Sequence, residues 1–70
     1  MEQGIVKFFN RIQGWGFIVS DKDGEELFVH YSDILSDSKY KNLEDGQRVK
    51  FSRAHGDRGL KAVRVEALRS

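Results

Sequence analysis

Aromatic and aliphatic side chains alternate in two short stretches of the chain, residues 15–18 (Trp-Gly-Phe-Ile) and 27–30 (Leu-Phe-Val-His). Successive side chains of a β-strand point to opposite faces, so Trp15 and Phe17 share one face, and Phe28 shares a face with the histidine two positions later. The aliphatic side chains fall on the opposite faces. This alternation predicts two half-buried strands, each with an aliphatic face toward a core and an aromatic face away from it.

Five segments have the β-branched and aromatic content of strands and are bounded by turn-forming residues. These segments are residues 4–10, 15–20, 26–30, 49–54 and 60–68. Asn10 ends the first, residues 21–25 form a polar turn with Asp-Gly chemistry, and residues 55–59 form a turn rich in glycine and charge. The first three segments predict an antiparallel meander, and five short strands with glycine-bearing turns predict an all-β small barrel.

Residues 31–47 contain few apolar side chains and many serine, aspartate and asparagine residues. We expect a long loop here, with one helical turn near residues 32–35, held to the core by Ile34 and Leu43. Loops longer than about 12 residues in compact domains are often functional.

A chain of 70 residues allows one domain, which we assign to residues 1–70. It can bury one face of a small sheet but has little material to cover the second. The aromatic face is therefore expected to be exposed, and a contiguous exposed aromatic patch usually marks a binding surface.

The composition argues against several classes of protein. The chain has no cysteine, so it has neither a disulfide framework nor a thiolate metal site. No apolar run approaches the ~20 residues that span a bilayer, and the N-terminus lacks a basic segment followed by an apolar run. We expect a cytoplasmic protein that does not bind membranes.

Charge is distributed unevenly along the chain, although the formal net charge is only +1. Residues 21–45 hold eight carboxylates and three lysines, whereas residues 46–70 hold seven basic and two acidic side chains. A polyanion held mainly through its phosphates would call for a larger basic excess. Any nucleic-acid binding must therefore depend on the aromatic side chains.

His30 invites a catalytic or metal-binding interpretation because Ser32 and Asp33 follow closely. Neighbours this close in a strand cannot form a relay of nucleophile, base and orienting acid, and the only other histidine, His55, lies in a distant turn. We expect no enzymatic activity, no metal, no cofactor and no small-molecule substrate. We expect a stacking or hydrogen-bonding role for His30.

Five segments, in this order and spacing, resemble the cold shock domain family. They are Lys-Phe-Phe-Asn at 7–10, Gly-Trp-Gly-Phe-Ile at 14–18, Leu-Phe-Val-His-Tyr-Ser at 27–32, Leu-Glu-Asp-Gly-Gln at 43–47 and Gly-Asp-Arg-Gly at 56–59. The second and third are similar to the two ribonucleoprotein motifs of that family. The resemblance implies a five-stranded antiparallel OB-fold-type barrel that binds single-stranded RNA and DNA. It also implies an RNA chaperone of the cold shock response, with effects on transcription antitermination.

The resemblance also implies which residues bind nucleic acid. Matched by position, they are Lys7, Phe8, Asn10, Trp15, Phe17, Phe28, His30, Tyr31, Tyr40 and Arg58. Three positions depart from the family pattern. Phe8 stands where tryptophan is usual, Gln13 where lysine is common and Leu60 where proline is usual, so less stacking area, one fewer phosphate contact and a different last turn are expected.

Phe8 poses a question of parity. Phe8 and Phe9 are adjacent in a strand, so one ring should face the core, and Val6 has the same parity as Phe8. Only a bulge or a strong twist places Phe8 among the exposed aromatic side chains. With the resemblance, we expect Phe8 to be exposed, and we assign Phe51 to the core.

Two alternatives belong to other functional classes. The first is a protein-interaction module, an SH3-like barrel that docks proline-rich peptides, although such a groove favours acidic residues where this chain offers Lys7, His30 and Arg58. The second is an OB-type subunit of the translation machinery that reads structured RNA. We expect a monomer because ligand occupies the exposed patch, with strand exchange into a dimer as the alternative.

Overall fold

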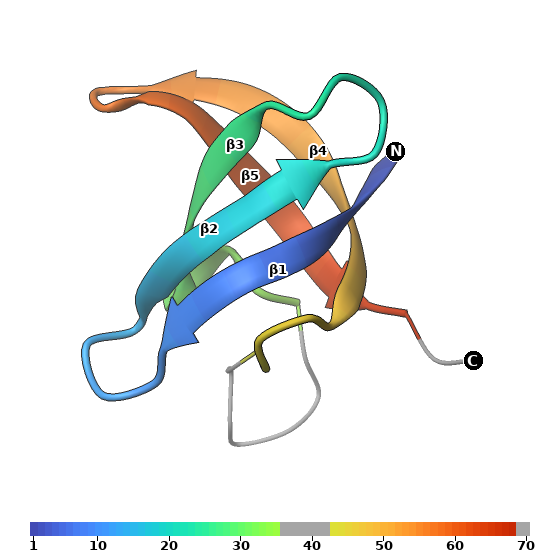
Figure 1. The fold of residues 1–70 in the computed structure, drawn as a ribbon. Coiled ribbons are helices and arrows are strands. Elements are labelled where there is room, and N and C mark those ends of the chain that lie inside the picture. Colours follow the sequence, from blue (N-terminus) through green and yellow to red (C-terminus); the bar gives the residue numbers. More distant parts are fainter. Residues whose placement is uncertain (36–42, 69–70) are drawn as a thin grey trace.

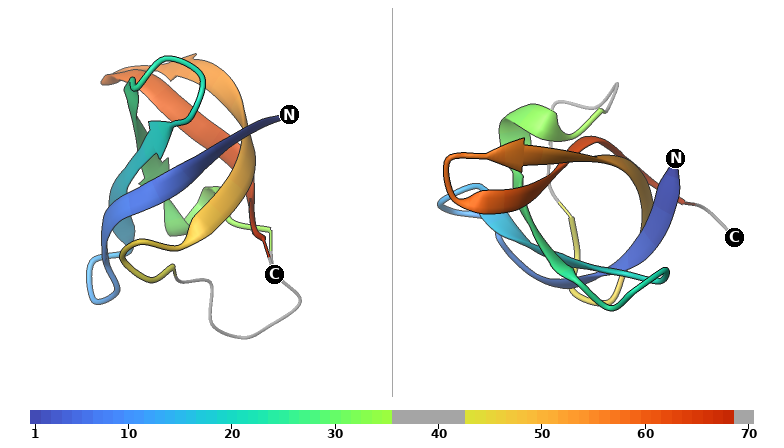
Figure 2. Two further views of the ribbon diagram at one scale, coloured as in Figure 1. Left: turned by 45° about the vertical axis from the view of Figure 1, so that its right-hand side comes forward. Right: turned by 90° about the horizontal axis from the view of Figure 1, so that it is seen from above.

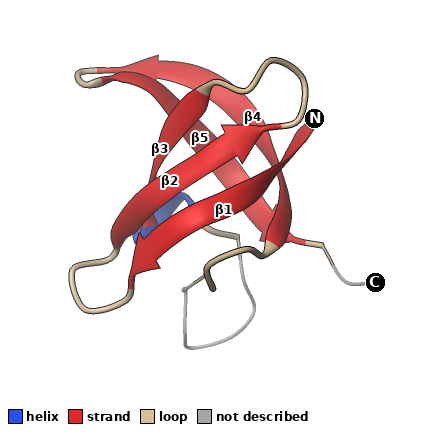
Figure 3. Cartoon of the chain, in the orientation of Figure 1, coloured by secondary structure: helices blue, strands red, loops and turns tan. Residues whose placement is uncertain are grey.

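The computed structural model describes residues 1–35 and 43–68 and shows five strands wrapped into a closed barrel (Figure 1). The strands are β1 (Glu2–Asn10), β2 (Trp15–Ser20), β3 (Glu26–His30), β4 (Arg48–Gly56) and β5 (Gly59–Ala67). Their order around the barrel is β1-β2-β3-β5-β4, and the view from above shows the ring that they form (Figure 2). A single 3-10 turn, η1 (Tyr31–Asp33), follows β3 (Figure 3). Within the described residues, no helix is long and apolar enough to cross a membrane.

The alternation of side chains predicted β2 and β3 with the bounds that the structure has. β1 begins two residues earlier than predicted, and η1 begins one residue earlier than the expected helical turn. The turn predicted over residues 55–59 is present but shorter, because His55 pairs with Leu60 and the two strands extend to Gly56 and Gly59. Only two residues remain in that turn.

Neighbouring strands are antiparallel except at the seam where the barrel closes. There β3 and β5 pair in parallel through Phe28 and Lys61. The chain after η1 extends this seam, because Ile34 forms a parallel bridge with Val65 and the Leu35 N–H donates to the Val65 carbonyl at 2.7 Å. The segment that follows β3 therefore continues the parallel pairing with β5.

The core is apolar, and its members come from all five strands and the segments that flank the loop. They are Val6, Phe9, Ile18, Leu27, Val29, Ile34, Leu43, Val49, Phe51, Ala62 and Val65. Ile34 and Leu43 are buried as predicted, and Phe51 is fully buried. The aliphatic faces of β2 and β3 therefore point into the barrel, as the alternation predicted.

Two β-bulges change which side chains face the core. In β1, Val6 pairs with Ile18 but Phe8 pairs with Phe17, so Lys7 is the additional residue. In β5, the pairing with β4 slips near Arg64, which has a φ of 54°. A bulge bends its strand and reverses the alternation beyond it.

Candidate nucleic-acid interface

Four aromatic rings from three strands gather on the outside of the barrel and form what we call the aromatic platform (Phe8, Trp15, Phe17 and Phe28). Phe8 on β1 pairs with Phe17 on β2, which pairs in turn with Phe28 on β3, so three rings form one row across the sheet. Trp15 lies two residues before Phe17 on the same face. All four side chains are partly exposed, whereas the aliphatic residues between them are buried.

The rings contact one another mainly edge to face. The Phe8 centroid lies 5.5 Å from that of Trp15 and 5.7 Å from that of Phe17, and the Phe17 centroid lies 5.9 Å from that of Phe28. The ring planes of Trp15 and Phe28 are nearly parallel, with an interplanar angle of 18° and centroids 6.3 Å apart. Such contacts hold the rings in fixed orientations.

The bulge at Lys7 is the reason that Phe8 belongs to the platform. Val6 is buried, Phe8 is partly exposed and Phe9 is buried. In a regular strand Val6 and Phe8 would point to the same face, so the bulge between them is what turns Phe8 outward. Gly16 allows β1 to lie close at this point, since a Cβ there would come within 2.7 Å of Phe9 Cα. The expected exposure of Phe8 through a bulge is confirmed.

A hollow of about 330 Å³ opens over the platform. Its lining residues are Trp15, Phe17, Glu26, Phe28, Arg58 and Leu60. Two of them were missed from the sequence. Glu26 lies two positions before Phe28 on the same face of β3, a spacing that could have indicated it. Leu60 reaches the hollow only because β5 closes against β3, and no local pattern predicts that closure.

Glu26 changes the electrostatics of the platform edge. The Lys7 Nζ lies 3.2 Å from Glu26 Oε2, and both side chains are about half exposed. An exposed ion pair of this kind contributes little to stability, but it offsets the charge that Lys7 presents to a polyanion. The positive charge near the platform is therefore smaller than the sequence suggested.

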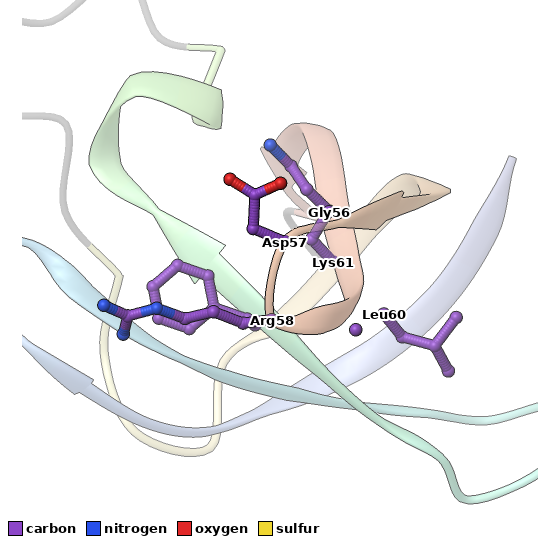
Figure 4. A pocket seen from close by; sticks show the side chains of 7 residues that line it. Gly56, Asp57, Arg58, Leu60 and Lys61 are labelled. Atoms are coloured by element: carbon purple, nitrogen blue, oxygen red, sulfur yellow. The ribbon is translucent and has the colours of Figure 1, made fainter.

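Arg58 lies in the turn between β4 and β5. Its Cζ is 5.8 Å from the centroid of the Phe28 ring, a cation–π distance. A smaller hollow of about 180 Å³ lies beside this contact and is lined by residues 56–61, from the turn and the strand ends that flank it, together with Phe28 (Figure 4). The turn thus places a planar cation against one ring of the platform. Leu60, where proline is usual, packs partly buried against the core.

His30 and Tyr31 continue the aromatic surface beyond Trp15. His30 pairs with Trp15 across β2 and β3, and its ring centroid lies 4.5 Å from that of Tyr31. The His30 Nδ1 accepts from the Ser32 N–H at 3.3 Å and lies 2.9 Å from the Ser32 Oγ, so η1 fixes the imidazole. Gly14 leaves room for Tyr31, because a Cβ at Gly14 would lie 2.5 Å from Tyr31 Cδ1.

The turn between β1 and β2 orients Trp15. Asn10 Oδ1 accepts from the Ile12 and Gln13 N–H groups at 3.0 and 2.9 Å, so this side chain shapes the turn. The Trp15 Nε1–H donates to Gln13 Oε1 at 2.8 Å. Gln13, which stands where lysine is common in the family, therefore positions the indole.

The structure brings most of the expected binding residues onto one side of the barrel. Those placed on or beside the platform are Lys7, Phe8, Trp15, Phe17, Phe28, His30, Tyr31 and Arg58. Asn10 ends β1 beside them and pairs with Trp15. Tyr40 lies outside the described residues.

A family model described as the 'Cold-shock' DNA-binding domain matches residues 2–68. The chain belongs to the cold shock domain family. This membership confirms the resemblance noted in the sequence and the OB-type barrel that it implied. It does not favour an SH3-like module.

Curated cold shock proteins match nearly the whole chain. The Cold shock-like protein CspG of Shewanella violacea is 46% identical over 65 residues, which are 93% of this chain and 91% of that protein. The Cold shock-like protein CspA of Bordetella pertussis is 43% identical over 97% of this chain and 100% of its own length. The Cold shock protein CspC of Bacillus subtilis is 47% identical over 94% of this chain and 97% of its own length.

A solved structure gives the same fold. The structure named drosophila Unr CSD456 superposes with a TM-score of 0.78 at 25% sequence identity. The match covers 97% of this chain and 26% of the longer one. The barrel therefore also occurs as one part of a larger protein.

Proposed function

We propose that this cold shock domain binds single-stranded RNA and DNA by stacking bases on the aromatic platform. The observation that carries the proposal is the row of three rings across β1, β2 and β3, completed by Trp15 and left partly exposed beneath a hollow. Single strands expose the faces of their bases, which a duplex hides. A flat ring can stack on any base, so this mode of binding has little preference for a particular nucleotide sequence.

The platform offers enough stacking to account for useful affinity. Each base stacked on an aromatic side chain contributes roughly 1 to 3 kcal/mol by alanine substitution. Three or four such stacks approach the ~8 kcal/mol of a micromolar complex. Lys7 is partly neutralised by Glu26, so among residues 1–35 and 43–68 Arg58 is the main cation at the platform. A shallow salt dependence follows, because each neutralised phosphate adds only about 0.7 to the slope for single strands.

In the cell, the protein acts as an RNA chaperone during cold shock, because its binding keeps RNA single-stranded. A ligand that prefers the open strand shifts a hairpin equilibrium toward the open form by mass action. This needs neither catalysis nor a cofactor, and it accounts for effects on transcription antitermination, where a terminator hairpin must stay open. The protein acts in the cytoplasm, and as a monomer, since nucleic acid covers the exposed rings.

Hairpin opening tests this function. An RNA hairpin with a short stem and a fluorophore–quencher pair at its ends is titrated with the protein, without nucleotide triphosphates. We expect fluorescence to rise in a saturable manner and to fall again when an unlabelled single strand competes. A hairpin with a long GC-rich stem is the control and stays closed. Failure to open the weak hairpin at saturating protein would contradict the chaperone role.

A further inference from the structure

We propose that the turn at residues 44–47 positions Phe8 on the platform and that the Asp45 carboxylate is its positioning group. This inference rests on the proposed function, since it concerns how the binding surface is assembled. Asp45 does not touch the platform. It acts on the backbone that carries one of the rings.

The turn holds β1 on both sides of the bulge. Before the bulge, the Val6 N–H donates to the Gln47 carbonyl at 2.9 Å, and the Gly46 N–H donates to the Val6 carbonyl at 2.7 Å. After the bulge, the Phe9 N–H donates to Asp45 Oδ1 at 3.1 Å. Lys7 and Phe8 are the two residues between these anchors, so the turn fixes the segment that projects Phe8 outward.

A side chain is needed at the second anchor because the strand ladder has ended there. The pairing of β1 with β4 runs from Glu2 to Ile5 and stops. Beyond it, the Phe9 N–H lies next to a buried ring, where an unpaired donor is costly. The Asp45 carboxylate supplies the acceptor that a neighbouring strand would otherwise provide.

The turn itself is well fixed. The Gln47 N–H donates to the Glu44 carbonyl at 3.1 Å, and the Glu44 N–H donates to Gln47 Oε1 at 3.0 Å. Gly46 takes a φ of +82°, which glycine adopts without strain. Leu43, just before the turn, is buried in the core. Because the turn is rigid, its hydrogen bonds to Val6 and Phe9 fix the position of this part of β1.

The test is a double-mutant cycle between Asp45 and Phe8, read as affinity for a short thymine oligonucleotide at a temperature where every variant is folded. Phe8→Ala is expected to weaken binding by roughly fivefold or more. Asp45→Ala should weaken it at least about threefold in the wild-type background and should not weaken it further in the Phe8→Ala background. Asp45→Asn retains an acceptor oxygen and should restore most of the affinity.

Glu44→Ala is the matched control. It removes the same charge from the same turn but leaves the backbone groups through which Glu44 makes its hydrogen bonds. Loss of an acidic charge near a polyanion strengthens binding, so Glu44→Ala should bind slightly more tightly where Asp45→Ala binds more weakly. Equal effects of Asp45→Ala in both Phe8 backgrounds, or no effect in either, would overturn the inference.

A second readout separates this inference from the proposed function. Nuclear Overhauser contacts between the Phe8 and Trp15 rings, whose centroids are 5.5 Å apart, report the position of Phe8 without any ligand. These contacts should persist in Glu44→Ala and weaken in Asp45→Ala. If the wild-type protein bound no single strand, the proposed function would fail, and this experiment would still decide what Asp45 does. Unchanged contacts in Asp45→Ala would refute its positioning role.

Discussion

The guanidinium of Arg58 lies over the ring of Phe28, with its Cζ 5.8 Å from the ring centroid. At this distance the cation contacts the Phe28 ring, and both side chains line the hollow over the platform. A base can then stack on the guanidinium while the positive charge attracts a phosphate. Arg58 therefore combines the two interactions on which the proposed binding depends.

Substitution of Arg58 separates these two contributions. Arg58→Ala removes the charge and the planar group, so affinity should fall several-fold and the slope of log affinity against log salt should drop by about 0.7. Arg58→Lys keeps the charge but not the plane, so the slope should stay near the wild-type value while affinity still falls. Fluorescence titrations at four salt concentrations measure both. An unchanged slope in Arg58→Ala would show that Arg58 contacts no phosphate.

Two phenylalanine-to-leucine changes distinguish the platform from the core. Phe17 is partly exposed on the platform, and Phe51 is fully buried. Phe17→Leu should weaken single-strand binding by about 1–3 kcal/mol, roughly 5- to 150-fold, and change the free energy of unfolding by less than about 1 kcal/mol. Phe51→Leu should destabilise the fold by about 1–3 kcal/mol and leave the affinity of folded protein unchanged. Urea unfolding and binding titrations give the two quantities, and the reverse pattern would contradict the assignment.

Stability should fall in acid because of the ion pairs around Arg53. Its guanidinium donates to both Glu2 oxygens at 2.8 Å and to Asp23 Oδ2 at 3.0 Å. These hydrogen bonds from Arg53 lower the pKa of Glu2 and of Asp23 below their ordinary values of 4.5 and 3.8. A carboxyl group whose pKa is lower in the folded than in the unfolded state stabilises the fold at pH values above its ordinary pKa. This stabilisation is lost as pH falls through the pKa of the folded state.

The acid dependence is tested with Arg53→Met. The wild-type free energy of unfolding should be level near pH 7 and fall below about pH 5. Arg53→Met should be less stable at pH 7, with a shallower decline in acid. Lys50→Met, which breaks the exposed ion pair with Glu66, is the control and should change the decline little. Parallel curves for wild type and Arg53→Met would contradict the attribution to Arg53.

Arg64 adopts a left-handed conformation at the bulge of β5, with a φ of 54°. This region is costly for most side chains and worst for β-branched ones. Arg64→Gly should therefore be more stable than Arg64→Val by about 1–2 kcal/mol. Both variants lose the same charge, so thermal or urea unfolding of the pair isolates the backbone effect. Equal stabilities would mean that the bulge shifts to accommodate valine.

Local sequence patterns predicted those features of the fold that depend on a single strand. Alternation gave the faces of β2 and β3, because a side chain there points in or out according to its position in the strand. It did not give the bulge at Lys7, whose presence depends on the pairing of β1 with two other segments. The resemblance supplied the exposure of Phe8, and the bulge explains it.

The remaining features depend on long-range packing. Lys7 and Glu26 form an ion pair across β2, because β1 and β3 both pair with that strand. Leu60 lines the hollow because the barrel closes between β3 and β5. Asp45 is 36 residues from the backbone group that it binds. No periodicity within a strand indicates such contacts, and so the sequence predicted the rings of the site better than the residues that hold them.

The most direct test of the account uses Trp15, the only tryptophan in the chain and a member of the platform. Its fluorescence is followed while the protein is titrated with a short thymine oligonucleotide, with single-stranded RNA and with a blunt DNA duplex, each at two salt concentrations. The account predicts strong quenching by both single strands, little by the duplex and a shallow salt dependence. Absence of quenching by either single strand would contradict base stacking on the aromatic platform.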